Sequence, residues 1–227
     1  MCSARNPNAP LALLGGTFDP VHWGHLRIAS ETAVALKLPE LRLIPSKAPV
    51  HRATPGATGE QRLAMLRLAV ADMPELAVDD RELTRDTPSY TVLTLASLRT
   101  EFPLRPLIWL IGVDAFLHIH QWYQWPRLFE LAHCVVMNRP AFAVSQALSI
   151  TLAEVWQGRL TRSAEPLTQT THGSIYLHTV TPQAISATTI RNSIAAGATD
   201  DALRHFLPEP VLAYIRAHQL YRSALAE

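Results

Sequence analysis

The chain has 227 residues, of which 48% are hydrophobic, and its 20 basic and 19 acidic side chains leave a net charge of +1. That length and apolar fraction predict a single domain over residues 1–227, with an ordered core from about residue 11 to residue 221. Without a basic stripe, the near-neutral charge argues against a nucleic-acid partner, and two cysteines are too few for a disulfide framework or a zinc site.

The start of the chain shows no apolar signal core, and no apolar run approaches the length needed to span a membrane. We therefore expect a cytoplasmic protein without a membrane partner. The sequence does not fix the oligomeric state and leaves a homo-oligomer open.

Short apolar runs alternate with amphipathic stretches along the chain. The apolar runs predict strands over residues 11–14, 41–44, 76–78, 107–111 and 133–137. The amphipathic stretches predict helices over residues 26–38 and 60–71, a third helix capped by Ser89, and a closing helix over residues 208–220. This alternation predicts an α/β fold with a doubly wound, mainly parallel sheet and helices on both faces.

Two regions lie outside the alternation. Residues 45–59 are rich in proline, alanine and threonine and predict a long loop. Residues 159–173 are polar and predict a mobile surface segment. Trp109 and Cys134 lie inside apolar runs, and we expect both in the core.

The most informative segment is residues 15–25, which leads from the first predicted strand into the first predicted helix. Gly15 and Gly16 can adopt backbone angles that other residues resist, and they let a ligand approach the main chain. His22 and His25 lie three residues apart, so both rings can donate hydrogen bonds to one anion beside the helix N-terminus. Because the chain has no Gly-Lys pair and no G-x-G-x-x-G turn, phosphate binding depends on these histidines. The alternative is a glycine-rich turn whose histidines merely cap a helix.

Further polar residues follow the later strands. Asp114 follows the run 107–111, Arg139 follows the run 133–137, and Ser186 precedes a late helix that carries Arg191. In a parallel sheet all of them project to the carboxyl edge, where α/β proteins bind ligands. Helical side chains lean toward the N-terminus, so Arg191 can reach a phosphate at the helix start that Ser186 caps. The alternative for Arg191 is a surface position on an amphipathic helix.

Two motifs give the sequence a family resemblance. Residues 18–25, FDPVHWGH, resemble the HxGH signature of the nucleotidyltransferase superfamily, and residues 185–191, ISATTIR, resemble its ISxTxIR helix start. From about residue 11 to residue 221 the chain resembles the bacterial nicotinate-nucleotide adenylyltransferases within that superfamily. The resemblance implies a Rossmann-like fold and adenylyl transfer from ATP to nicotinate mononucleotide in NAD biosynthesis. The products are nicotinate adenine dinucleotide and pyrophosphate. Since the substrate supplies the nucleophile, catalysis consists of alignment and charge stabilisation.

The resemblance implies catalytic roles at the ATP phosphates for His22, His25 and Arg191. It also implies that residues of both motifs contact ATP, namely Gly15, Gly16, Thr17, Phe18, Gly24, Ser186 and Thr188. The family usually has serine where this chain has Ala187, which leaves only a backbone N–H at that position. Mg²⁺ would arrive with ATP and need few protein ligands, so no metal site built by the protein is expected.

For nicotinate mononucleotide, the resemblance implies contacts from His51, Arg52, Tyr90, Thr91, Asp114, Trp122 and Arg139. The first two lie in a segment similar to the family's PPH[KR] loop, in which Val50 replaces the second proline. The segment SYT at 89–91 resembles one whose main-chain N–H groups meet the nicotinate carboxylate, and Trp122 matches a tryptophan that stacks on the pyridine ring. The alternative for His51 and Arg52 is a solvated basic loop. The alternative for the SYT segment is a helix cap, and the alternative for Trp122 is a core position.

Two other functions compete with this one. Pantetheine-phosphate adenylyltransferase shares the histidine signature, but this chain is long for that enzyme, and the SYT segment with Trp122 favours a pyridine nucleotide. A non-catalytic nucleotide-binding module would be favoured by loss of His22, His25 or Arg191, and all three are present. The sequence does not decide between nicotinate and nicotinamide mononucleotide.

Overall fold

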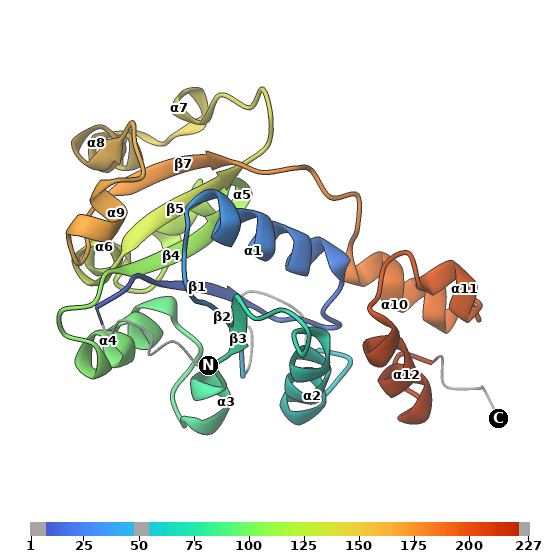
Figure 1. Cartoon of the computed structure of the whole chain (residues 1–227). Helices are drawn as coiled ribbons and strands as arrows, with labels where there is room; N and C mark the ends of the chain where they lie inside the picture. Colours follow the sequence, from blue (N-terminus) through green and yellow to red (C-terminus); the bar gives the residue numbers. More distant parts are fainter. Residues whose placement is uncertain (1–7, 48–54, 223–227) are drawn as a thin grey trace.

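A seven-stranded parallel sheet forms the centre of the computed structural model, which describes residues 8–47 and 55–222. Its strands lie in the order β3-β2-β1-β4-β5-β7-β6, and every neighbouring pair is parallel (Figure 1). The strands are β1 (Leu11–Gly16), β2 (Leu41–Pro45), β3 (Leu76–Val78), β4 (Leu107–Gly112), β5 (His133–Asn138), β6 (Leu160–Thr161) and β7 (Ile175–Thr179). The predicted α/β, Rossmann-like architecture is confirmed.

Helices connect the strands and cover the sheet. The longer ones are α1 (Trp23–Ala35), α2 (Gly59–Ala69), α4 (Thr91–Glu101), α8 (Ile150–Arg159), α10 (Ala187–Ala195) and α12 (Glu209–Ala217). The shorter ones are α3 (Arg81–Thr84), α5 (Val113–Phe116), α6 (Leu128–Leu131), α7 (Val144–Ala147), α9 (Pro166–Gln169) and α11 (Asp200–Leu203), with 3-10 turns η1 (Ile119–Gln121) and η2 (Trp125–Arg127). No helix among the described residues is both long and apolar enough to cross a membrane.

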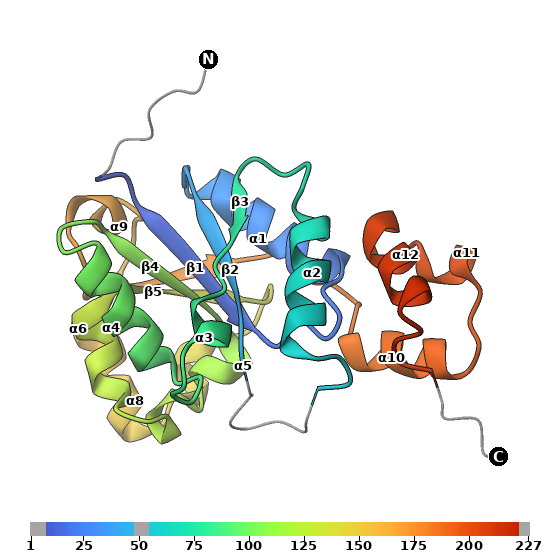
Figure 2. The same ribbon diagram turned by 90° about the horizontal axis from the view of Figure 1, so that it is seen from below.

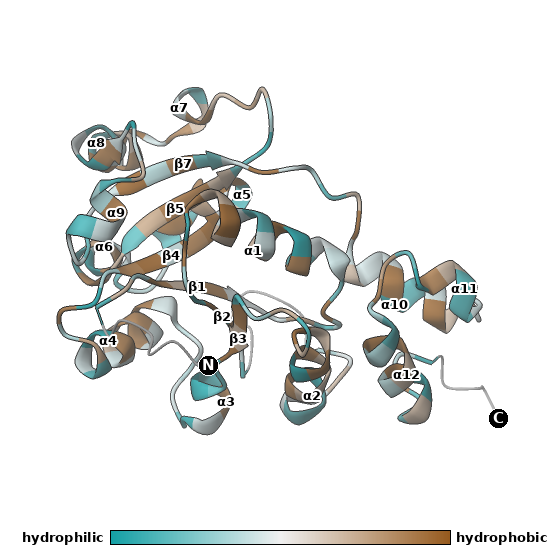
Figure 3. Cartoon of the chain, viewed as in Figure 1, coloured by the Kyte–Doolittle hydropathy of each residue, from teal (hydrophilic) through white to brown (hydrophobic). Residues whose placement is uncertain are grey.

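The two faces of the sheet bury different side chains, because successive residues of a strand point in opposite directions. On β1, Ala12 and Leu14 join a cluster with α1, α2 and the C-terminal helices. Leu11 and Leu13 join a second cluster with α4, α5, α6 and α8. Strands buried on both faces need near-continuous apolar runs, and β1 and β4 are largely brown, the hydrophobic colour, in Figure 3.

The C-terminal helices α10 to α12 lie beyond α2 at one end of the molecule (Figure 2). Ile190 of α10 and Val211 of α12 belong to the same cluster as Met65 of α2 and Leu26 of α1. This continuity supports one domain over residues 1–227, which stays a prediction.

Helix α2 has a start that its sequence specifies. The Thr58 hydroxyl accepts a hydrogen bond from the backbone N–H of Gln61, and the Gln61 side chain accepts one from the backbone N–H of Thr58. This reciprocal capping box satisfies two N–H groups that the first turn leaves without helical partners. It also sets the helix phase that turns Arg62 inward, where its side chain is 1% exposed.

The predicted surface position of residues 159–173 is confirmed, since Leu167 is the one buried residue among them, but the segment also contains regular structure that was not predicted. Leu160 and Thr161 form β6, which pairs with β7 at the edge of the sheet, and α9 buries Leu167. The predicted strands also omitted β7, and the predicted helices omitted α8. Of the predicted loop 45–59, Pro45 belongs to β2 and Gly59 to α2, residues 46–47 and 55–58 are irregular, and residues 48–54 lie outside the described chain.

Candidate active site

The strand order reverses beside β1. The chain runs from β1 outward through β2 to β3, then returns to place β4 on the other side of β1. The carboxyl ends of β1 and β4 therefore mark the position at which α/β sheets bind their ligands. Because the sheet is parallel, Asp114 after β4 and Arg139 after β5 lie at the same edge as the histidine motif, as predicted.

His22 and His25 form a stacked pair at the start of α1. His22 occupies the N-cap position with extended backbone angles, and His25 lies in the first turn. Their ring centroids are 3.7 Å apart with an angle of 25° between the planes, and Phe18 packs its ring at 5.1 Å against His25. The spacing of three residues therefore brings both rings to one place, where a single anion can contact them together.

Burial keeps His22 neutral in the free protein. The residue is 4% exposed, and this burial lowers the pKa of its imidazole to about 4. Among the described residues its Nδ1 atom has no hydrogen-bond partner. A buried polar atom without a partner is costly, so a ligand that hydrogen-bonds this ring would be stabilised.

Gly24 makes room for this ring. A Cβ atom at position 24 would lie 2.9 Å from Nδ1 of His22 and 3.4 Å from Cβ of Ile185, which belongs to the second motif. The glycine of the HxGH signature therefore permits a close approach of side chains.

The expected role of Gly15 and Gly16 needs correction. Both end β1, and neither has the positive φ that glycine tolerates; in this loop Phe18 adopts it, with φ of 51°. Glycine at position 16 instead leaves space for the Phe18 ring, since a Cβ there would lie 3.0 Å from it. A Cβ on Gly15 would meet nothing within 4 Å. Thr17 lies between Gly16 and Phe18, and its carbonyl oxygen accepts a hydrogen bond from Arg62.

The second motif reaches the first through Arg191. Its Nη1 donates a hydrogen bond of 2.6 Å to the main-chain oxygen of Asp19, and Nη2 donates one of 3.3 Å to the Thr188 hydroxyl. Ser186 occupies the N-cap position of α10, but its side chain makes no capping hydrogen bond, which corrects that prediction. Ser186 and Thr188 are exposed. The guanidinium group thus lies beside the histidine loop, as its lean toward the helix N-terminus predicts.

Asp114 and Arg139 pair with each other. Nη2 of Arg139 donates a hydrogen bond of 2.6 Å to Oδ1 of Asp114, and both side chains are more than half exposed. This pair links the carboxyl ends of β4 and β5. An exposed pair of this kind contributes little stability, so its two residues remain available to a ligand.

Aromatic side chains gather near the SYT segment. Trp122 packs against the buried Trp109, with ring centroids 5.8 Å apart, and Tyr90 packs against Tyr123 at 4.8 Å. Trp122 remains partly exposed, whereas Trp109 is 5% exposed and lies in the core as predicted. Cys134 is also in the core, where burial raises the pKa of its thiol.

The prediction that Ser89 caps the third helix is wrong. The N-cap residue of α4 is Tyr90, and no side chain caps that helix. The Ser89 hydroxyl instead accepts a hydrogen bond from the backbone N–H of Lys47, just after β2. This contact fastens Ser89, Tyr90 and Thr91 to the carboxyl edge of the sheet. His51 and Arg52, predicted to meet the acceptor, lie outside the described residues.

Sequence reasoning missed three residues of this region: Asp19, Arg62 and Tyr221. Asp19 and Arg62 are buried, and Tyr221 donates a hydrogen bond of 2.8 Å to the Asp19 carboxylate. Arg62 donates hydrogen bonds of 2.7 Å to the main-chain oxygens of Thr17 and Ser46. An arginine three residues before Met65 on the apolar face of α2 is a signal that could have been noticed. Nothing in the sequence marks Tyr221.

No group of three or more histidine, cysteine or carboxylate side chains among the described residues could hold a metal ion.

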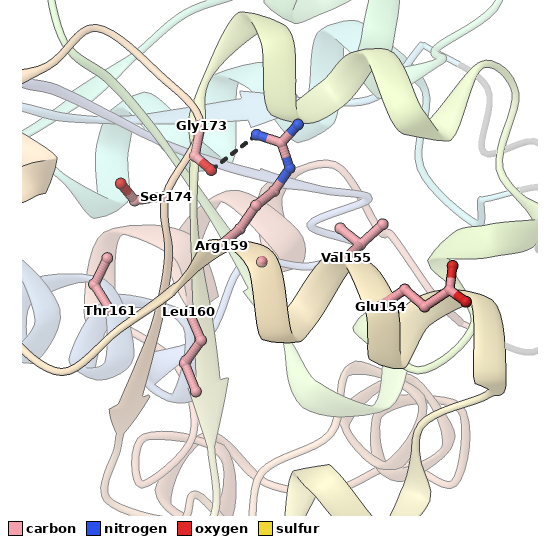
Figure 4. Close-up of a pocket in the computed structure, with 8 residues that line it drawn as sticks. Glu154, Val155, Arg159, Leu160, Thr161, Gly173 and Ser174 are labelled. Atoms are coloured by element: carbon pink, nitrogen blue, oxygen red, sulfur yellow. Dashed lines mark hydrogen bonds between the residues drawn. The ribbon is translucent and has the colours of Figure 1, made fainter.

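A hollow elsewhere on the surface lies apart from this site (Figure 4). It is lined by residues of α8 and β6 and by Gly173 and Ser174, which precede β7. It therefore lies at the amino ends of β6 and β7, whereas the histidine pair follows the carboxyl end of β1.

A parallel sheet with a stacked histidine pair at its switch point and an arginine from a late helix beside that pair is the arrangement expected of a nucleotidyltransferase. Residues 13–193 match the model of the cytidylyltransferase-like family. A Chromohalobacter salexigens protein named "Probable nicotinate-nucleotide adenylyltransferase" is 46% identical, over 97% of this chain and 100% of its own length. A Halorhodospira halophila protein of the same name is 48% identical, over 91% of this chain and 93% of its own.

Among solved structures, a Plasmodium falciparum nicotinic acid mononucleotide adenylyltransferase complexed with NaAD has a TM-score of 0.69 and 14% identity. The alignment covers 94% of this chain and 97% of that one, and the likeness shows the shared fold. The chain belongs to the cytidylyltransferase-like family and, within it, to the nicotinate-nucleotide adenylyltransferases, which transfer an adenylyl group from ATP in NAD biosynthesis.

Proposed function

We propose that His22, His25 and Arg191 carry the adenylyl transfer by holding the ATP phosphates. The observation that supports this most is the meeting of the two motifs, in which Arg191 bonds the loop that presents the stacked histidines. A phosphate oxygen of nicotinate mononucleotide forms a bond to the α-phosphorus of ATP. The bond from that phosphorus to the bridging oxygen breaks, and its electron pair leaves with pyrophosphate.

The protein supplies alignment and charge stabilisation to this step. His22 and His25 would donate hydrogen bonds to the phosphate oxygens where negative charge grows. Arg191 would hold the β and γ phosphates, and Ser186 and Thr188 would add donors at the exposed start of α10. Residues 15–18 and Gly24 would line the phosphates through main-chain atoms.

We assign the acceptor to the carboxyl ends of β4 and β5 and the neighbouring aromatic residues. Trp122, backed by Trp109, offers a partly exposed ring on which a pyridine can stack. The first N–H groups of α4, near Tyr90 and Thr91, would meet the nicotinate carboxylate, since no side chain caps that helix. Asp114 and Arg139 would contact the ribose and phosphate side of the nucleotide, and His51 and Arg52 would add positive charge.

Mg²⁺ would enter with ATP and neutralise phosphate charge. We expect the reaction to take place in the cytoplasm, and we assign the enzyme neither a nucleic-acid partner nor a membrane partner.

The testing experiment is pyrophosphate release with ATP and Mg²⁺, comparing nicotinate mononucleotide, nicotinamide mononucleotide and phosphopantetheine as acceptors. Strong preference for the first supports both the reaction and the acceptor residues. Activity with phosphopantetheine alone would keep the phosphate site and discard the acceptor assignment. In the same assay, His22→Ala should lower turnover about a hundredfold or more, because it removes a donor to the transition state; near-normal turnover would contradict its role.

A further inference from the structure

Asp19 is the point where four parts of the chain meet beside the phosphate site. It lies in the loop between β1 and α1, three residues before His22, and is 5% exposed. Its carboxylate accepts hydrogen bonds from the backbone N–H groups of Gly56, at 2.8 Å, and Ala57, at 3.1 Å. The Tyr221 hydroxyl donates a third, at 2.8 Å.

Arg191 contacts the same residue in two ways. Its Nη1 donates a hydrogen bond of 2.6 Å to the main-chain oxygen of Asp19, while the carboxylate oxygen Oδ2 lies 3.7 Å away. The stronger contact is therefore to a neutral carbonyl oxygen, and the ion pair is loose. The Arg191 side chain is 32% exposed, so it is not closed off from a bound nucleotide.

The three donors on Asp19 explain why the ion pair stays loose. Oδ1 accepts from the Ala57 N–H and the Tyr221 hydroxyl, and Oδ2 accepts from the Gly56 N–H, so these donors stabilise the carboxylate charge that would otherwise draw the guanidinium group closer. If the Tyr221 hydroxyl were absent, Oδ1 would lose a donor, and the buried charge would draw Arg191 into a closer pair. A closer pair with Asp19 would withdraw guanidinium donors from the ATP phosphates.

The packing around Tyr221 favours this geometry. A Cβ atom on Gly56 would lie 3.1 Å from the Tyr221 ring and 3.7 Å from Cδ of Arg191, so both side chains pack over that glycine. Burial and the adjacent Asp19 carboxylate raise the pKa of Tyr221, which keeps its hydroxyl protonated and able to donate.

We infer that Tyr221 is a positioning residue for the phosphate site: by bonding the Asp19 carboxylate it holds Arg191 free to bind ATP. This inference rests on the proposed role of Arg191. It assigns the end of the described chain a part in the reaction, through a hydroxyl that touches neither substrate.

The test is a double-mutant cycle between Tyr221→Phe and Arg191→Ala, in the full-length enzyme and below the unfolding temperature of every variant. Tyr221→Phe should lower kcat/KM for ATP about tenfold, the size expected for one hydrogen bond to a charged group, and leave KM for nicotinate mononucleotide unchanged. With Arg191→Ala already present, Tyr221→Phe should change kcat/KM for ATP by less than about twofold, because Tyr221 acts on ATP only through Arg191. Tyr214→Phe removes the same hydroxyl from nearby helix α12, where that ring packs against His218, and should change neither constant.

An unchanged kcat/KM for ATP in Tyr221→Phe would overturn the inference, as would an equal effect with and without Arg191. If Tyr221→Phe does not fold, Asp19→Asn is the second variant: it keeps the side chain's size and removes the charge that would draw Arg191 inward, so kcat/KM for ATP should not fall, and a tenfold fall would overturn the inference. If Arg191→Ala itself leaves kcat/KM for ATP intact, the proposed role of Arg191 fails. If Arg191→Ala is damaging and Tyr221→Phe is silent, only the positioning role fails.

Discussion

His22 binds protons less readily in the folded chain than in the unfolded one, because burial lowers its pKa from 6.5 to about 4. Between those two values the unfolded chain carries the proton and the folded chain does not. Stability is therefore lost as the pH falls through this range, by up to roughly 3 kcal/mol for a shift of this size.

We expect His22→Gln to weaken that dependence. Its free energy of unfolding, measured by urea denaturation between pH 6.5 and pH 4, should fall less steeply than that of the parent chain. His205→Gln, at an exposed position, should leave the slope as it is. Identical slopes for His22→Gln and the parent would show that His22 is not the titrating group.

Gly24→Ala separates the activity of the site from the stability of the fold. Alanine favours a helix over glycine by about 1 kcal/mol, but its Cβ would lie 2.9 Å from Nδ1 of His22 and displace that ring. We expect kcat to fall at least about tenfold, while the melting temperature changes little. Gly158→Ala on α8 is the matched control, because its Cβ meets nothing within 4 Å. Equal activity in the two variants would show that the space at Gly24 is not needed to position His22.

The candidate site could be predicted from the sequence only where a short motif carries it. His22, His25 and Arg191 lie in compact motifs whose spacing fixes their geometry. Asp19 lies in the same motif, yet its role depends on Tyr221 and Gly56, which no local pattern connects to it.

At the scale of elements, Trp122 follows η1, and its ring packs against the ring of Trp109 on β4. Trp122→Ala should raise KM for nicotinate mononucleotide, since it removes the stacking surface, and leave KM for ATP near the parent value. Steady-state kinetics with each substrate varied in turn measures both constants. If only the constant for ATP changes, the stacking assignment is wrong.

The predicted elements that match the structure are those with a clear apolar pattern. The strands β1, β4 and β5 are buried on both faces and contain the apolar runs that marked them, and β2 was recognised although Arg42 interrupts its run. The edge strand β6 has two residues, and the neighbouring β7 is only partly buried, so their half-polar sequences gave no strand signal. Pairing with a neighbour stabilises them, and single-sequence patterns do not show pairing.

At the scale of the molecule, charged side chains join β2 and the residue before it to the segments that follow β3 and precede β4. The carboxylate of Glu40, the residue before β2, accepts hydrogen bonds from Arg42 at 2.8 Å and from Arg105 at 2.9 Å. Arg42 also donates a hydrogen bond to the Asp79 carboxylate. Burial would raise the pKa of Glu40, but hydrogen bonds and charges from both arginines outweigh it and lower the pKa below 4.5. This contribution to stability is present above pH 4.5 and is lost as the pH falls through the lower, folded-state value.

Glu40→Gln should destabilise the molecule at neutral pH by about 3 kcal/mol, because it leaves the buried Arg105 with one less counter-charge. Its free energy of unfolding should also fall less on acidification below pH 4.5 than that of the parent. Urea denaturation at several pH values measures both effects. Glu209→Gln, from an exposed pair with Arg204, should change little. A Glu40→Gln chain as stable as the parent at neutral pH would contradict the prediction.

The bond between Tyr221 and Asp19 joins residues that are 202 positions apart. Ribosomes add about 5–20 residues per second, so Asp19 waits about 10–40 s for the residue that completes its hydrogen bonds. The sheet strands that flank the site are all synthesised earlier. A nascent chain can therefore hold a nearly finished fold while Asp19 still lacks one hydrogen bond, and if Tyr221 positions Arg191 as we infer, full activity with ATP comes only with the final stretch of translation.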